Sequence, residues 1–546
     1  MPGPISAPEI ADVEKPPAEI VPQLDNKRLP EGRVFNPWIV AVVVTIGTFM
    51  EVLDTSIANV ALPHIAGSLS ASLVEGSWVL TSYLVANAVV LPISGWLSSI
   101  LGRKNYFLLS VFFFTVFSAA CGFAPTLGML VFFRVAQGLA GGGLQPSVQA
   151  ILADSFSPQK RSMAMSLYTI AILVAPVLGP TAGGWITDSY SWRWIFYINI
   201  PIGILCVFLT RIILEDPPYM KEARQRARKL SVDWAGLGLI SIGLASLEIV
   251  LDKGQELDWF GSPFIIFFAT VALIAIAGTI YWELKRPNPI VNLRLFRERN
   301  FLFCCILILC LYAALFAATY LLPTFMQEML GYTATTSGMV FAPAGLCTMI
   351  VVPFVGYMLT LGYDPRKMVF FGLVVLASSF WWMSSLNLEI AERNIILPRI
   401  VQVLGAGIVT VPVSTIIFRF LPKTESSQAA GLYALMRNEG GSIGIALVST
   451  MLQRKAQLHQ QMLGQHITDS SLVQQYIARA AGSPGNVADH RYFAMSNLYK
   501  AMQRQAMLLA YMDQFRMLCG VILCILPLVF FLKRPVAQKH VELDVH

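Results

Sequence analysis

Two carboxylates stand inside an apolar stretch near the start of the chain. Glu51 and Asp54 lie in a run that begins at Trp38 and is long enough to cross a bilayer, which takes about 20 residues. Three residues apart, they share one face of a helix. A charge in the hydrocarbon costs about 2.5–3.5 kcal/mol on insertion scales, so such groups usually face a cavity, find a partner or carry a proton. The alternative is a carboxylate near the helix end that reaches headgroup water.

A cation and two amides stand in a later apolar run. Arg134 lies in the stretch 128–152, and Gln137 and Gln145 follow it. A guanidinium keeps its proton, so Arg134 cannot carry one, but it can hold a nearby carboxylate ionised. The alternative is an arginine that extends to the membrane surface or bonds to backbone carbonyls. The two glutamines could bind substrate or simply join helices.

Three more charged residues lie in apolar runs, and each has a structural alternative. Glu248 lies about a turn from the end of its run, where contact with water is at least an equal explanation. Arg437 and Glu439 are two residues apart. They therefore point to different faces of a helix and need not pair.

The composition predicts an all-α polytopic membrane protein. Of 546 residues, 55% are hydrophobic and only 13% are charged. The eight cysteines lie in apolar runs and the six histidines are scattered, so we expect no metal site and no disulfide framework. No phosphate-binding loop occurs, so we do not expect ATP as the direct energy source, and we expect no cofactor. The net charge of +7 follows from membrane topology and does not indicate nucleic acid.

Fourteen apolar spans are expected, and the basic residues orient them. Lys and Arg are concentrated in alternate loops, such as Arg103–Lys104 and Arg366–Lys367, which places both termini in the cytoplasm. The expected spans are 38–61, 77–100, 105–124, 128–152, 162–187, 194–214, 232–252, 262–283, 301–322, 335–360, 367–387, 394–420, 427–451 and 512–532.

A weak internal repeat divides these spans. Arg134–Gln137 is echoed by Arg399–Gln402, eight spans later. Two six-helix halves would place the copies six spans apart, so we expect two inserted helices between the halves, an organisation typical of transporters. The expected division is a disordered tail 1–36, a six-helix bundle 37–215, a basic linker 216–231, the inserted helices 232–284, a linker 285–300, a second bundle 301–535 and a tail 536–546.

Several local motifs follow one another in a fixed order along the chain. They are Leu53-Asp54-Thr55-Ser56-Ile57-Ala58-Asn59, Gly95 to Gly102-Arg103-Lys104, Arg134-Val-Ala-Gln137-Gly138, Pro176 to Gly184, Trp192 to Gly203, Leu251 to Trp259, and Arg437 to Gly444. Together they resemble the major facilitator superfamily, and specifically its fourteen-helix drug:proton antiporters of the EmrB/QacA type. The resemblance runs from about Pro37 to Pro535. It implies a secondary exporter of hydrophobic or amphipathic compounds in the inner membrane, driven by inward proton flow.

The resemblance also implies roles for residues in this chain. Asp54 is implied to be the main proton-coupling residue, with Glu51 and Arg134 beside it. The implied substrate cavity contains Asn59, Gln137, Gln145, Gln402 and Arg437. The antiporter motif consists of Pro176, Gly179, Pro180, Gly183 and Gly184, and the gating loop contains Gly95, Gly102, Arg103 and Lys104. The motif's prolines kink a helix and its glycines allow close approach; plain close packing is the alternative. Ser98 and Ser99 stand where the family's gating loop usually has an acidic residue. The ion pair by which this loop is thought to hold the closed state, its charge lock, is therefore in doubt in this half.

A long segment, 453–511, separates the last two spans. Its apolar residues recur at helical spacing on either side of Ser483-Pro484-Gly485, which predicts two amphipathic helices that must bury an apolar stripe. The resemblance implies docking of an EmrA-like periplasmic adaptor and a TolC-like outer-membrane channel. The alternative is a cap on the protein's own outer face. For the whole chain, the alternatives are an exporter of one solute, such as a fatty acid, bile salt or siderophore, and a membrane receptor without transport.

Overall fold

The computed structural model describes residues 36–157, 160–216, 233–286, 289–418, 421, 425–465 and 487–533. All regular elements in these ranges are helices, so the all-α class is confirmed. The expected tail 536–546, and almost all of the tail 1–36 and of the linker 216–231, lie outside this part of the chain.

The helices follow the expected spans closely, with α4 and α5 together forming one of them. The helices are α1 (Pro37–Ser68), α2 (Leu73–Leu101), α3 (Arg103–Phe123), α4 (Leu127–Gly141), α5 (Leu144–Ser155), α6 (Arg161–Ser189), α7 (Trp194–Tyr197), α8 (Asn199–Ile213), α10 (Trp234–Lys253), α11 (Pro263–Lys285), α12 (Arg299–Thr324), α13 (Ala334–Thr360), α14 (Pro365–Met383), α15 (Arg393–Ile417), α16 (Ser426–Gln465) and α18 (Val487–Ile525). Short turns of 3-10 or π geometry complete them: η1 (Trp259–Gly261), η2 (Leu293–Arg297), η3 (Phe325–Met329) and η5 (Leu526–Phe531).

Thirteen stretches in the described ranges are long and apolar enough to cross a membrane. The expected fourteenth span is α16, which carries glycines, serines, Arg437 and Glu439 in place of a uniformly apolar sequence. It packs between α12, α18 and α2, so its polar side chains are shielded by protein. The chain is a multi-pass membrane protein.

Local sequence explains where several helices begin and end. α2 starts at a capping box, in which Ser72 Oγ accepts from Glu75 N at 3.2 Å and Glu75 Oε2 accepts from Ser72 N at 2.8 Å. α14 starts with Asp364 as its cap and Pro365 in the first turn. α2 ends at Gly102, whose φ of 86° lies in the left-handed region that favours glycine.

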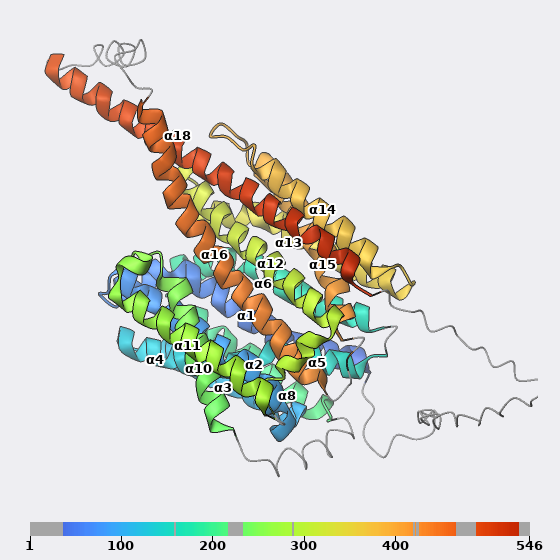
Figure 1. Cartoon of the computed structure of the whole chain (residues 1–546). Coiled ribbons are helices and arrows are strands. Elements are labelled where there is room, and N and C mark those ends of the chain that lie inside the picture. Colours follow the sequence, from blue (N-terminus) through green and yellow to red (C-terminus); the bar gives the residue numbers. More distant parts are fainter. Residues whose placement is uncertain are drawn as a thin grey trace, which may run out of the picture. The chain divides into compact units, whose positions relative to one another are not determined.

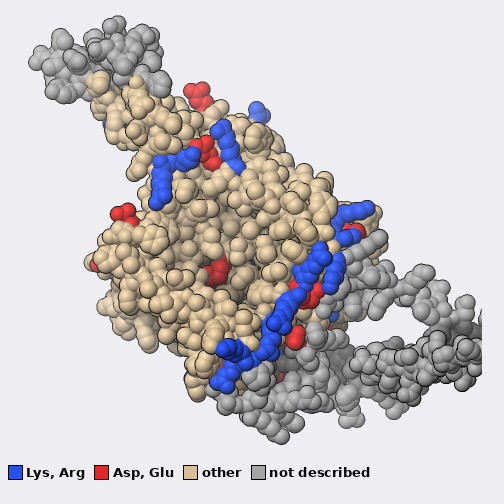
Figure 2. All heavy atoms as spheres, in the orientation of Figure 1, with Lys and Arg blue, Asp and Glu red and all other residues tan. Residues whose placement is uncertain are grey.

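Charge is distributed over the visible face as a membrane protein requires. In Figure 2, lysines and arginines follow one edge of the described chain and a smaller group lies on the opposite side. The band between them is almost uncharged, apart from an acidic side chain deep in a hollow. An uncharged band flanked by charged ends is the pattern expected where lipid covers the protein.

The two halves meet along two pairs of helices. α6 packs against α1 of its own half and against α13 of the other half, and α2 packs against α16 (Figure 1). The inserted helices α10 and α11 pair with each other, and α10 also contacts both α2 and α16. The inserted hairpin therefore touches both halves.

The described parts of the segment 453–511 are helical, and they belong to α16 and α18. α16 continues to Gln465 and α18 begins at Val487, so the described parts of the segment extend the last two spans beyond their neighbours (Figure 1). The extensions pair with each other: Gln460 donates to the Tyr499 hydroxyl at 3.0 Å, and His459 Nε2 lies 2.9 Å from Asp513 Oδ2. Uninterrupted helices keep every backbone bond internal. The expected break at Ser483–Gly485 lies outside the described residues.

Candidate functional site

Asp54 lies at the centre of a buried polar network that joins three spans. One carboxylate oxygen, Oδ2, accepts from Arg134 Nη1 of α4 at 2.7 Å. The other, Oδ1, accepts from Asn199 Nδ2 of α8 at 2.7 Å and from Gln137 Nε2 of α4 at 3.1 Å. Arg134 Nη1 also donates to Gln137 Oε1 at 3.0 Å. A single carboxylate thus holds α1, α4 and α8 together.

Arg134 is fully enclosed by protein. Its side chain has 0% exposure, and its guanidinium lies 4.7 Å from the centre of the Tyr83 ring and 5.3 Å from that of Phe196. Its Nε donates to the Val79 carbonyl at 3.2 Å. Removing one partner of a buried ion pair typically costs about 3–5 kcal/mol, because the remaining charge loses its compensation. The arginine therefore does not extend to the membrane surface.

Glu51 occupies a different environment on the same helix face. Its Oε1 accepts from Asn87 Nδ2 at 3.1 Å and from Gln145 Nε2 at 3.0 Å, and the residue is 3% exposed. No ion pair to Glu51 occurs in the described chain. A guanidinium stabilises a carboxylate charge better than neutral amides do. Asp54 is therefore stabilised by the positive charge of its arginine, whereas Glu51 is stabilised only by amide dipoles. The two acids therefore lie in different electrostatic surroundings.

The other expected substrate-site residues lie apart from this network. Arg437 donates to the Tyr168 hydroxyl, Gln402 accepts from Arg399 in the second half, and Asn59 is exposed. No hydrogen bond seen in the described chain joins these three to Asp54. Their part in substrate binding stays a prediction.

Sequence reasoning missed two amides of the site. Asn199 bonds to Asp54 and, at 3.0 Å, to Ser118 Oγ, and Asn87 bonds to Glu51. Asn199 belongs to the motif from Trp192 to Gly203 that carried part of the resemblance. A polar amide within an apolar run is the sequence feature that could have identified it as a site residue. Asn87 offers the same signal in α2.

The proline and glycine motif lies where α6 meets α1. Pro180 has no N–H for the carbonyl of Pro176 four residues earlier, and Ser56 Oγ of α1 donates to that carbonyl at 3.3 Å. A β-carbon at Gly179 would overlap the Ser56 side chain, and one at Gly183 would lie 3.2 Å from Ile57. Gly184 is also buried. The kinked part of α6 therefore needs small residues to contact α1.

We expect Gly179→Ala to push α6 away from α1 and to impair efflux more than it lowers stability. Inserting a methyl group into a packed contact costs about 1–3 kcal/mol. Gly67→Ala is the control, because nothing lies within 4 Å of a β-carbon there. Efflux assays and thermal unfolding of both variants check this. Wild-type efflux by Gly179→Ala would contradict a role for the tight α1–α6 contact.

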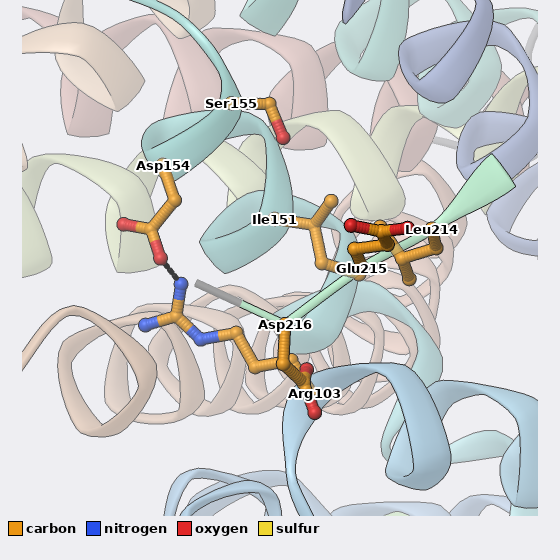
Figure 3. A pocket seen from close by; sticks show the side chains of 7 residues that line it. All are labelled: Arg103, Ile151, Asp154, Ser155, Leu214, Glu215 and Asp216. Atoms are coloured by element: carbon orange, nitrogen blue, oxygen red, sulfur yellow. Dashed lines mark ion pairs between the residues drawn. The ribbon is translucent and has the colours of Figure 1, made fainter. Parts of the chain in front are cut away.

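Arg103 of the expected gating loop forms an ion pair with a residue that the sequence did not suggest. Arg103 forms an ion pair with Asp154 at the end of α5, which Figure 3 shows. Arg103 Nε also donates to Ser427 Oγ of α16 at 3.0 Å. Asp154 thus supplies an acid for Arg103 where Ser98 and Ser99 offer none, and the part of this ion pair in gating stays a prediction.

The neighbouring residues of the loop fasten the same end of the bundle. Lys104 N donates to Asp216 Oδ1 at 2.8 Å, beside the pocket of Figure 3, and Lys104 Nζ donates to the Arg211 carbonyl at 2.9 Å. A β-carbon at Gly95 would lie 2.6 Å from the Gln428 Cα. α2 and α16, from opposite halves, are therefore in backbone contact here.

Arg134→Ala is expected to lose transport more severely than Arg134→Lys. A lysine ammonium keeps the charge beside Asp54, whereas the guanidinium also bonds to Gln137 and Val79. Transport by both variants, normalised to the amount inserted, checks this. Equal loss would show instead that the fork geometry of arginine is what matters.

The many membrane-spanning helices and the buried charged network are typical of a polytopic membrane transporter. The family model described as "Major Facilitator Superfamily" matches residues 44–445. The chain belongs to the major facilitator superfamily, as its motifs predict.

Individual proteins agree with this assignment. The "Multidrug export protein EmrB" of Escherichia coli (strain K12) is 37% identical over 498 residues, covering 91% of this chain and 95% of that protein. The "Fatty acid resistance protein FarB" of Neisseria gonorrhoeae is 35% identical over 492 residues, which cover 90% of this chain and 95% of that protein. The crystal structure of the human organic anion transporter MFSD10 (TETRAN) shares the fold with a TM-score of 0.57 at 13% identity, covering 91% of this chain and all of that one. The predicted likeness to EmrB-type proteins is confirmed.

Proposed function

We propose that this protein is a multidrug exporter of the inner membrane that exchanges hydrophobic or amphipathic compounds for protons by alternating access. The single observation that carries the proton part is the buried ion pair of Asp54 and Arg134, which joins α1, α4 and α8. The substrate class rests on the similarity to EmrB, which covers nearly the whole of both chains.

The network suggests how a proton changes the structure. Protonation of Asp54 removes the charge that compensates Arg134 and reduces the acceptor capacity for Asn199 and Gln137. The bonds between α1, α4 and α8 weaken together, so the helices are free to shift. Glu51, bonded to α2 and α5, is the secondary proton site. The tight α1–α6 contact then transmits the shift towards α13 and the other half.

The experiment is a panel of toxic compounds tested on cells with and without the protein. Growth protection and accumulation of fluorescent compounds are measured with and without a proton uncoupler. Protection against several unrelated apolar compounds, abolished by the uncoupler, supports the proposal. Export that persists without a proton gradient contradicts it.

An exporter of one solute is the second candidate, and the similarity to FarB favours a fatty acid. Under this alternative, one long-chain fatty acid would compete with every transported compound and would be exported far better than any of them. Competition measurements on the same cells separate the two.

Orientation follows from the basic loops, with both termini in the cytoplasm. A reporter fused after Lys423 is expected to report the cytoplasm, and one inserted near Ser483 the outside. Both insertion points lie outside the described residues. A reversed signal at either point would invert the proposed topology.

The extended hairpin of α16 and α18 is the proposed docking site for an EmrA-like adaptor, which would connect the protein to a TolC-like channel. The extensions pair with each other, yet leave three large side chains partly exposed: Leu458 at 40%, Met495 at 45% and Tyr499 at 49%. Apolar side chains gathered on an aqueous extension indicate a partner.

A further inference from the structure

The inserted helix α10 brings a second set of acids to the boundary between the halves. Its Asp252 accepts a hydrogen bond from Thr81 of α2, and its Glu248 accepts from Ser442 Oγ of α16 at 2.7 Å. α10 is thus bonded to α2 of the first half by one carboxyl and to α16 of the second half by another. None of these residues belongs to the Asp54 network.

Glu439 of α16 lies beside Glu248. Ser442 follows Glu439 by three residues, so the two share a face of α16, and it is this serine that bonds to Glu248. Because α10 packs against α16 and Ser442 bonds to Glu248, the Glu439 carboxyl on the same face of α16 lies on the side that faces Glu248. Glu248 is 0% exposed and Glu439 is 4% exposed.

The protein around this pair supplies few compensating groups. Neither oxygen of Glu439, nor Oε2 of Glu248, has a hydrogen-bond partner in the described chain. Neither acid forms an ion pair with a described lysine, arginine or histidine. Arg437 is nearby in sequence but points to another face of α16, where it bonds to Tyr168 and lies near Tyr312.

Two adjacent carboxylates cannot both stay ionised in such surroundings. Burial penalises each charge, and each charge penalises the other. The serine hydroxyl compensates only one oxygen. In this arrangement at least one of the two groups must therefore hold a proton, as in carboxyl pairs that share one.

We propose that Glu248 and Glu439 form a second proton-binding site, separate from Asp54, that carries a proton while α10 and α16 are in contact. When the halves move and α10 separates from α16, water reaches the pair. The O–H bond of the neutral carboxyl then breaks, the electron pair stays on the carboxylate, and water takes the proton. The site rests on the proposed function, and it adds one proton to each cycle.

α10 also offers this site a route to the aqueous edge. Asp252 follows Glu248 by one turn, and Glu256 follows Asp252 by another four residues in the turn after the helix. Glu256 pairs with Lys253, and its side chain is 39% exposed. Acids spaced about one turn apart thus lead from the pair towards the α10–α11 turn.

The first test is infrared spectroscopy of the purified protein without substrate. The carbonyl stretch of a protonated carboxylic acid is expected in the wild type and expected to lose intensity in the double variant Glu248→Gln/Glu439→Gln. Glu389→Gln is the matched control and should leave that intensity unchanged, because this acid is exposed in the loop between α14 and α15, away from the pair and its route. An unchanged signal in the double variant overturns the proposal, whether or not the protein transports drugs.

The second test is the number of protons exchanged per substrate, measured in proteoliposomes from the reversal potential of transport. The double variant is expected to exchange one proton fewer than the wild type, while Glu389→Gln exchanges the same number. An unchanged ratio with intact transport means that the pair is a fixed structural contact, which overturns the proposal. If the variants bind cationic substrates weakly while the ratio is unchanged, the pair is a cation-binding site, which also overturns it.

Discussion

Asp54→Asn is expected to insert normally and to lose proton-coupled efflux down to the background of empty vesicles. Asparagine keeps an oxygen for Arg134 Nη1 and an amide of similar size, but it cannot bind and release a proton. Because Arg134 is fully buried, the lost charge should also lower stability by about 3–5 kcal/mol. Efflux is measured in everted vesicles by substrate-induced collapse of a pH gradient.

Two further variants separate coupling from folding. Asp54→Asn combined with Arg134→Gln removes both charges and should recover much of the lost stability without recovering transport. Glu51→Gln should be milder and change which compounds are exported, since its partners are the amides of Asn87 and Gln145. Near-normal pumping by Asp54→Asn would remove this residue from the coupling mechanism.

The second large effect is expected from shortening the α16–α18 hairpin. Replacing all of 453–511 would remove Tyr511, which is fully buried and bonds to Glu328 at 3.1 Å. A better replacement joins Gln460 directly to Tyr499 by a short Gly/Ser linker, because these side chains are already in hydrogen-bond contact. The shortened protein should insert and exchange protons in vesicles, yet lose adaptor co-purification and whole-cell resistance.

A gentler variant tests the docking surface itself. Leu458→Ser with Met495→Ser changes two exposed side chains and leaves the contact of His459 with Asp513 in place. This variant should weaken adaptor co-purification while vesicle transport stays at the wild-type level. If the shortened protein still retains its adaptor, the docking surface lies elsewhere and the hairpin acts as a cap.

Much of the fold could be predicted from local properties of the chain. A bilayer leaves backbone groups no partner except their own helix, so each long apolar run had to be a helix. The same physics made the buried charges conspicuous, since Asp54, Arg134 and Glu439 are costly in hydrocarbon. Both arguments depend only on the residue types in a run and therefore need no tertiary information.

The choice of partners was decided by the tertiary structure. Spacing along one helix cannot say which residue of another helix will face a side chain, because that depends on the rotation and depth of both helices. Asn199 therefore entered the Asp54 network unforeseen, and Asp154 took the place of the missing acid beside Arg103. The sequence by itself determined a many-helix membrane protein with acids that must be shielded. Packing alone paired Asp54 with Arg134 and placed Glu248 against Glu439, because only side chains brought together across helices can compensate or repel each other.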